Sequence, residues 1–212
     1  MRSFKMSIAI ASTLAMLLLT LTSARAASQT AQERAAKRVE EPERHFHEAS
    51  KYFAKNDNQN AAGEIRSGAA LLKREAGRHN APNKAGLQAA ALELDTLAAK
   101  VEKGQVSSPN ELDQAFARAD LALARNSHQM AEAAIAQGNH KQAGSWLEAT
   151  SDYVEDAAGW SKQKLDTGES ATLHGVRALG RKVQDGAYWS ADEVKKGVGF
   201  LDGEITKVGQ HL

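Results

Sequence analysis

Histidine and carboxylate side chains are the sequence's best candidates for metal chemistry. Glu41, His45 and Glu48 are spaced four and three residues apart, so a helix would place them on one face. An internal repeat, described below, would set His128 level with Phe46 on a companion helix. Imidazole and carboxylate groups on facing helices bind zinc, copper or iron. The alternative is a solvated polar face, because neither Glu-x-x-His nor His-Glu-x-x-His occurs.

Three aromatic residues recur at intervals of seven in a later stretch that has helical spacing. Trp146, Tyr153 and Trp160 would lie on one face of that helix, where aromatic rings offer a large contact area with few rotamers to freeze. Such a face can line a cleft for an apolar or planar ligand, or contact a partner. Packing in the core is the alternative interpretation and the commoner use of aromatic side chains.

Catalytic patterns are missing from the sequence. There is no nucleophile elbow, no glycine-rich phosphate loop after a strand, and no carboxylate pair that its spacing separates from ordinary helix-surface charge. The chain contains no cysteine, which excludes disulfides, thiolate metal sites, covalent haem attachment and a lipoprotein anchor. We therefore expect a protein that is not an enzyme and carries no cofactor.

The N-terminus has the pattern of a bacterial secretory signal peptide. Arg2 and Lys5 precede an apolar run from Ile8 to Leu21, and Ala24-Arg25-Ala26 offers small residues where a signal peptidase reads. The run is shorter than the roughly 20 residues that a transmembrane helix needs. We predict cleavage after Ala26 and a periplasmic location, with an uncleaved anchor as the alternative.

Charge and composition limit the kinds of protein that the mature chain can be. Without the basic residues at positions 2, 5 and 25, the 27 lysines and arginines become 24, against 26 acidic residues. A near-neutral chain lacks the electrostatic footprint of a nucleic-acid-binding protein. The apolar residues are largely alanine, with few Val and Ile and three prolines, which favours closely packed helices over sheet. The predicted fold class is all-α.

The elements that must position these residues are four or five antiparallel helices in a bundle over residues 27–167. The central pair is a hairpin from Ser108 to Leu165, which turns at Gln137-Gly138-Asn139-His140. Ser108-Pro109-Asn110-Glu111 predicts a capping box at its start, with the Ser108 side chain accepting from the backbone amide of Glu111. Gly138 can adopt the left-handed conformation that ends a helix, and Asn139 can cap the next one.

A weak internal repeat supports an arrangement of stacked hairpins. Four residues recur 82 positions later with the same order of small residue, turn residue, small residue and large apolar residue: Ala49, Asn56, Ala61 and Ile65, then Ala131, Gly138, Ala143 and Leu147. Over about 30 residues at each place this resembles a tetratricopeptide-repeat hairpin, which implies a small residue on one helix packed against one on the next. The aromatic and proline positions of that family are mostly unfilled, so generic packing of alanine-rich hairpins is the alternative.

The tail from 168 to 212 is rich in glycine but keeps a regular apolar stripe. Its spacing of about 3.55 residues is close to a heptad seam, and Ser190-Ala191-Asp192-Glu193 predicts a second capping box after a break at Tyr188-Trp189. The candidate contact residues of this stripe are Leu173, Val176, Val183, Trp189, Val194, Leu201 and Ile205. The stripe is expected to dock on the bundle or a partner, or alternatively to lie on a membrane surface.

The leading functional hypothesis is an exported protein that binds another protein, or itself, in the bacterial envelope, in a role related to stress or assembly. It rests on helical architecture and on missing catalytic signal, which makes it an associational argument. A lipid-associating protein that uses residues 169–212 is the first alternative. A carrier of a small ligand or metal in the bundle interior is the second.

Overall fold

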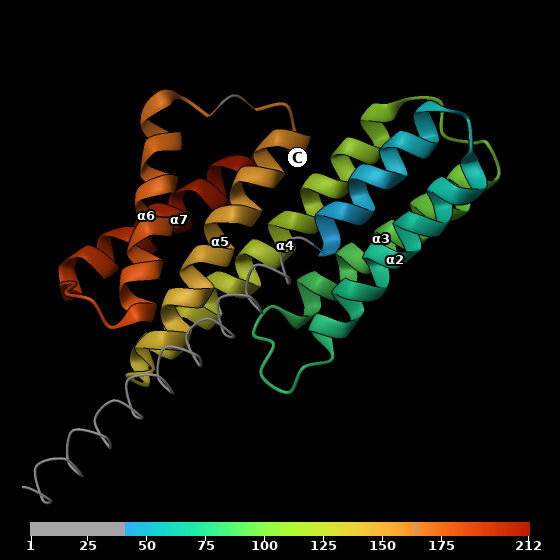
Figure 1. The fold of residues 1–212 in the computed structure, drawn as a ribbon. Helices are drawn as coiled ribbons and strands as arrows, with labels where there is room; N and C mark the ends of the chain where they lie inside the picture. The colour runs from blue at the N-terminus through green and yellow to red at the C-terminus, as the bar shows by residue number, and fades with distance from the viewer. Residues whose placement is uncertain (1–40, 164) are drawn as a thin grey trace, which may run out of the picture.

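The computed structural model describes residues 41–163 and 165–212 (Figure 1), so the predicted signal peptide lies outside the described residues. An N-terminal helix is described over residues 41–54. Six helices follow: α2 (Asn58–Ala76), α3 (Lys84–Glu102), α4 (Pro109–Ala136), α5 (His140–Trp160), α6 (Thr167–Asp185) and α7 (Ala191–Gly209). The described residues contain no strand, and the prediction of an all-α fold is confirmed. None of these helices is long and apolar enough to cross a membrane.

Side-chain caps explain where most of the helices begin. Asp57 and Asn139 accept hydrogen bonds from the backbone amides three residues ahead, and full capping boxes start α6 at Asp166 and α7 at Ser190. Ser108 behaves differently from the prediction, because its hydroxyl accepts from the amide of Asn110 and no reciprocal bond from Glu111 is formed. Proline at the first position of α4 already fixes the backbone there.

The pairs α2–α3, α4–α5 and α5–α6 lie side by side and run in opposite directions, whereas α7 crosses α6 and packs on α4 and α5 (Figure 1). The helix α4 is the longest of them. The N-terminal helix, α2 and α3 gather along the first half of α4. The helices α5, α6 and α7 gather along its second half. The long helix therefore belongs to both groups and joins them.

The two halves repeat one another in detail at their first turns. Asn56 and Gly138 are 82 residues apart and both adopt positive φ, 59° and 67°. The amide of Asp57 donates to the carbonyl of Tyr52 at 3.0 Å, and the amide of Asn139 donates in the same way to Ala134 at 2.9 Å. These are equivalent helix-ending motifs. Their four small residues, Ala49, Ala61, Ala131 and Ala143, are each fully buried.

The repeat extends beyond the stretch that the sequence pattern indicated. Gly104 and Gly186, also 82 residues apart, end α3 and α6 with positive φ, 64° and 70°. Ser108 and Ser190 then cap α4 and α7. We call residues 41–122 the first unit and residues 123–204 the second unit. Each unit contains four helical segments, and α4 supplies the last segment of one and the first of the other.

Equivalent positions also make equivalent contacts across the helix pairs. Lys73 of α2 forms an ion pair with Asp95 of α3 at 2.5 Å. The same two positions in the second unit hold Glu155 of α5 and Arg177 of α6, paired at 2.6 Å with the charges exchanged. A single architecture therefore accommodates two different sets of side chains.

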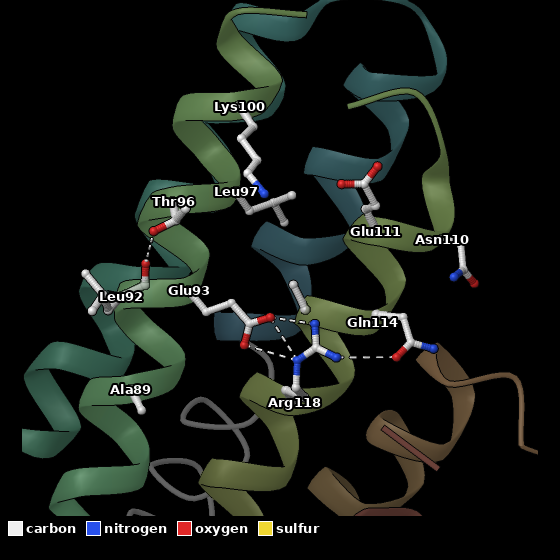
Figure 2. A pocket seen from close by; sticks show the side chains of 11 residues that line it. Ala89, Leu92, Glu93, Thr96, Leu97, Lys100, Asn110, Glu111, Gln114 and Arg118 are labelled. Carbon is white, nitrogen blue, oxygen red and sulfur yellow. Dashed lines mark hydrogen bonds and ion pairs between the residues drawn. The ribbon is translucent and has the colours of Figure 1, made fainter. Parts of the chain in front are cut away.

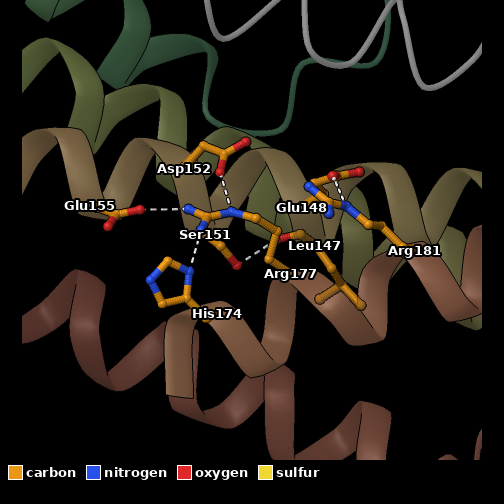
Figure 3. Close-up of polar contacts among 8 residues, drawn as sticks. All are labelled: Leu147, Glu148, Ser151, Asp152, Glu155, His174, Arg177 and Arg181. Carbon is orange, nitrogen blue, oxygen red and sulfur yellow. Dashed lines mark hydrogen bonds and ion pairs between the residues drawn. The ribbon is translucent and has the colours of Figure 1, made fainter. Parts of the chain in front are cut away.

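Charged side chains from α5 and α6 form a ladder along the interface between these helices (Figure 3). Arg177 donates to Asp152 at 2.5 Å and to Glu155 at 2.6 Å, and Arg181 donates to Glu148 at 2.7 Å. Next to this ladder the two backbones almost touch at Gly144 and Gly180, where a Cβ on Gly180 would lie 2.7 Å from the carbonyl oxygen of Gly144. Only glycine fits at this crossing.

The tail folds back onto the bundle as α6 and α7. Six of the seven predicted stripe residues are at most 5% exposed: Leu173, Val176, Val183, Val194, Leu201 and Ile205. The seventh, Trp189, is partly buried against the same core. The chain breaks at Gly186, whose left-handed conformation ends α6, so the regular stripe is divided between two helices.

Candidate partner-binding grooves

An open groove with a cavity volume of about 610 Å³ runs between α3 and α4 (Figure 2). Residues spaced three or four apart on each helix face it, because that spacing places side chains on one side of a helix. From α3 these are Ala89, Leu92, Glu93, Thr96, Leu97 and Lys100. From α4 they are Asn110, Glu111, Gln114, Ala115 and Arg118.

The groove has an apolar floor and one exposed apolar wall. Leu97 and Ala115 form part of the floor and are only 6% and 3% exposed. Leu92 stands beside them with 67% of its surface exposed. Among the described residues, Leu92 and Tyr188 are the exposed large apolar side chains. Covering an exposed leucine next to an apolar floor lowers the free energy, because apolar surface is removed from water.

Charged side chains stand at both ends of this groove. Arg118 donates from Nη2 to Glu93 at 2.5 Å, from Nε to the same carboxylate at 2.8 Å, and from Nη1 to the backbone carbonyl of Leu212 at 3.3 Å. This network holds the guanidinium across the groove. Lys100 and Glu111 lie at the other end, one on each helix (Figure 2).

The second unit repeats the groove between α6 and α7, with a cavity volume of about 420 Å³. Three lining residues are identical at the 82-residue offset: Leu97 and Leu179, Lys100 and Lys182, Glu111 and Glu193. Five other matched positions differ: Gly175, Ala178, Lys196, Gly197 and Phe200 stand where the first groove has Glu93, Thr96, Gln114, Ala115 and Arg118. Both grooves therefore keep a leucine in the lining, and a lysine and a glutamate at matching positions.

An apolar floor with a polar rim is the anatomy of a surface that binds another protein. A groove between two antiparallel helices suits an amphipathic helix, whose apolar side chains enter at spacings of three and four residues. The side chains of the two grooves could supply apolar contact, charge and hydrogen bonds to such a helix.

The four predicted metal ligands have separate partners in the structure. His45 contacts Glu64 at 2.5 Å, and Glu41 pairs with Arg74 at 2.7 Å. Glu48 pairs with Lys51 at 2.7 Å. His128 is buried in the second unit, where Nε2 lies 3.1 Å from the carbonyl oxygen of Val198. The structure does not bring these four together, because positions that are equivalent in the repeat lie in different units.

No group of three His, Cys, Asp or Glu side chains in residues 41–163 and 165–212 is placed to hold a metal ion. The three aromatic residues of α5 lie in the core. Trp146 and Tyr153 are 6% and 3% exposed, and Trp160 is partly buried. The Trp160 ring lies edge-on to Phe116 with centroids 5.2 Å apart, and its Nε1 donates to Glu43 at 3.1 Å. These rings pack the core.

A cluster of buried carboxyls lies where the N-terminal helix meets α4 and α5. Asp120 of α4 is fully buried, and the carboxyl of Glu43 lies close enough to interact with it. Burial, together with the charge of Glu43, raises the pKa of Asp120 well above its usual value. Burial and the charges of Glu43 and Asp152 raise the pKa of Asp156 to about 8. These carboxyls hold protons inside the folded protein.

Sequence reasoning missed the groove residues and the carboxyl cluster. A signal for the groove was present in Leu92, which falls off the apolar stripe of α3 formed by Leu87, Leu94 and Leu97 and so predicts an apolar side chain on the solvent side. Asp120 gave a similar signal, because it shares the face of α4 that carries Phe116. Leu92 is an apolar residue at an exposed position, and Asp120 is a charged residue at a buried position.

Comparisons with protein-family models, with curated proteins and with solved structures found no match to this chain.

Proposed function

We propose that this chain is an exported, non-enzymatic helical protein that binds another protein in the bacterial envelope through the groove between α3 and α4. Its fold in this role is a bundle of antiparallel hairpins, weakly similar to tetratricopeptide repeats, with a docked amphipathic tail. The observation that carries the proposal is Leu92, an exposed leucine that lines an apolar-floored groove of about 610 Å³. The partner is an amphipathic helix. The groove between α6 and α7 is a second candidate surface of different chemistry, since His174 stands at the position of Leu92 and Phe200 at the position of Arg118.

Charge at the groove favours a partner helix with both signs on its flanks. Lys100 and Glu111 face one another across the groove and would each accept an opposite charge. Arginine is enriched among the few residues that carry most of the binding energy at protein interfaces. Arg118 is already fixed by Glu93, so its guanidinium loses little conformational entropy when a partner covers it.

A photo-crosslinking amino acid at position 92 tests the proposal in living cells. We expect a specific covalent adduct with an envelope protein from position 92. The matched control is the same amino acid at Tyr188, the other exposed apolar residue, which lies outside the α3–α4 groove and is 91% exposed. Adduct formation at both positions, or at neither, would contradict the groove assignment.

A substitution supplies the second arm of the test. Leu92→Asp should reduce recovery of the crosslinked partner from a neighbouring groove position by about tenfold or more, because it puts a charge on the apolar wall. Tyr188→Asp is the control and should leave recovery unchanged. Both side chains are exposed, so neither change should lower the thermal midpoint.

Lipid association through the tail has less support. The apolar side chains that would enter a bilayer are buried against the bundle, as for Leu173 and Leu201, at 1% and 0% exposed. Such a role would require α6 and α7 to leave the bundle and to expose its core.

A further inference from the structure

A second kind of cavity lies at the corner where the α4–α5 turn meets the start of α7. Its volume is about 490 Å³, and it is lined by side chains from α4, α5, α6 and α7 together with Trp189. The lining is almost entirely apolar. The Trp189 ring closes one side, where its centroid lies 4.7 Å from that of His140. We call this cavity the Trp189 cleft.

The first unit shows why space is open at this place in the second. Ile135 and Val198 line the cleft, and the equivalent positions 82 residues earlier are Phe53 and Phe116. Phe116 is fully buried and stacks on Phe46 with centroids 4.5 Å apart. The second unit thus has smaller side chains at two positions where the first has phenylalanine.

The two charged side chains in the lining of the cleft, Glu132 and Lys195, differ in their ion pairing. Glu132 lies 3.8 Å from the imidazole of His128. Lys195 also lines the cleft, and within residues 41–163 and 165–212 it has no ion pair at 4 Å or less. An ammonium group beside an apolar cavity favours a ligand that carries its own negative charge at one end.

We propose that the Trp189 cleft binds a small amphiphile with an apolar chain or planar body and one anionic end. The body lies against Ile135, Val198 and Trp189, and the anionic end meets Lys195. The cavity volume falls within the range of about 300–1,000 Å³ that is typical of small-molecule sites. This site is separate from both grooves, so a test of ligand binding here is independent of the proposed protein partner.

The probe for the test is 1-anilinonaphthalene-8-sulfonate, which is planar, apolar and anionic, and which becomes fluorescent in an apolar cavity. The full mature chain should give a saturable rise in fluorescence with one site per protein. Decanoate should displace the probe, whereas decanol should do so more weakly and decyltrimethylammonium least of all. Circular dichroism on the same samples checks that the protein stays folded.

Two pairs of variants locate the bound probe. Lys195→Gln should weaken its affinity about two- to fivefold, as expected for one solvent-exposed charge contact. Lys84→Gln is the control and should not, because Lys84 is exposed on α3 and lines neither the cleft nor a groove. Ala136→Trp should fill the cleft and weaken binding at least tenfold. Ala133→Trp is its control, because both alanines are exposed on α4 but only Ala136 lines the cleft.

Several results would overturn the proposal. One is the lack of saturable binding to the wild-type chain. Another is equal weakening by Ala136→Trp and Ala133→Trp, which would place the probe elsewhere. Equal displacement by decanoate and decanol, with Lys195→Gln indistinguishable from Lys84→Gln, would contradict the anionic end of the ligand that we propose.

Discussion

Buried carboxyls make the stability of this protein depend on pH in an unusual direction. A carboxyl whose pKa is raised on folding binds more protons in the folded state than in the unfolded state. Asp156, with a pKa of about 8, and Asp120, raised well above its usual value, are both of this kind. The contribution of these two carboxyls to the free energy of unfolding is therefore fully present below the unfolded pKa near 4 and is lost as pH rises toward the folded pKa.

We expect the free energy of unfolding to decline between pH 5 and pH 8 by at most about 1.4 kcal/mol per pH unit for each such proton. Asp120→Asn should flatten this dependence, because the amide carries no titrating proton and can still donate to Glu43. Urea unfolding followed by circular dichroism at several pH values measures both slopes. Asp185→Asn, an exposed change far from the cluster in sequence, is the control, and a slope equal to that of Asp120→Asn would refute the assignment.

The contacts of single residues depend on how helices cross, which spacing along one helix does not give. His45 was predicted to share a face with Glu41 and Glu48, and in the structure it contacts Glu64 of α2. Trp146 and Tyr153 share one side of α5, and that side points into the core. Periodicity gives the face of a helix, but only packing decides what covers that face.

At the scale of elements, the crossing of α5 and α6 depends on two glycines. Gly144 and Gly180 allow the two backbones to approach so closely that a Cβ on Gly144 would overlap the carbonyl oxygen of Gly180. The equivalent positions in the first unit are Ala62 and Ala98, both fully buried. The second pair of helices is therefore expected to be the less tolerant of added atoms.

Gly144→Ala should lower the free energy of unfolding by about 1–3 kcal/mol, since the overlap with backbone forces α6 away from α5. Gly159→Ala on the same helix has no heavy atom within 4 Å of the added Cβ, so it should raise stability by up to about 1 kcal/mol. Thermal melts of both variants measure the difference. A shift of the thermal midpoint in the same direction for both variants would contradict the close approach of α5 and α6 at Gly144.

Helix existence and helix ends were largely predictable because their causes are local. The turn at Gly138, the cap at Asn139 and the capping box at Ser190 all follow from residues within four positions. Asp166 and Glu169 have the same sequence pattern and form a capping box, but none was predicted there. The close crossing at Gly144 could not be found in this way, because the glycines of a crossing lie on different helices.

At the scale of the whole molecule, the tail is part of the folded body. Buried Leu201 and Val208 of α7 and Leu173 of α6 belong to the same core as the helices before them. Each fully buried side chain of this size contributes roughly 1.5–3 kcal/mol. The stability of the bundle and the presence of the tail are therefore coupled.

Deleting residues 168–212 should lower the thermal midpoint of the remaining bundle by about 5 °C or more, on a scale of about 2–4 °C per kcal/mol for a chain of this size. The intact mature protein should not float with anionic liposomes, because its apolar stripe is covered. Differential scanning calorimetry and a flotation gradient make these two measurements. An unchanged midpoint together with flotation would favour lipid association as the function.

The shared helix α4 also has an evolutionary consequence. Tandem duplication of an ancestral segment of 82 residues would account for the matching turns at Asn56 and Gly138 and the matching caps at Ser108 and Ser190. Duplication in frame would fuse the last helix of one copy to the first helix of the next. The pairs Lys73–Asp95 and Glu155–Arg177 keep an ion pair at the same two positions with the charges exchanged. Because α4 packs against helices of both units, a substitution in α4 acts on the folding of both.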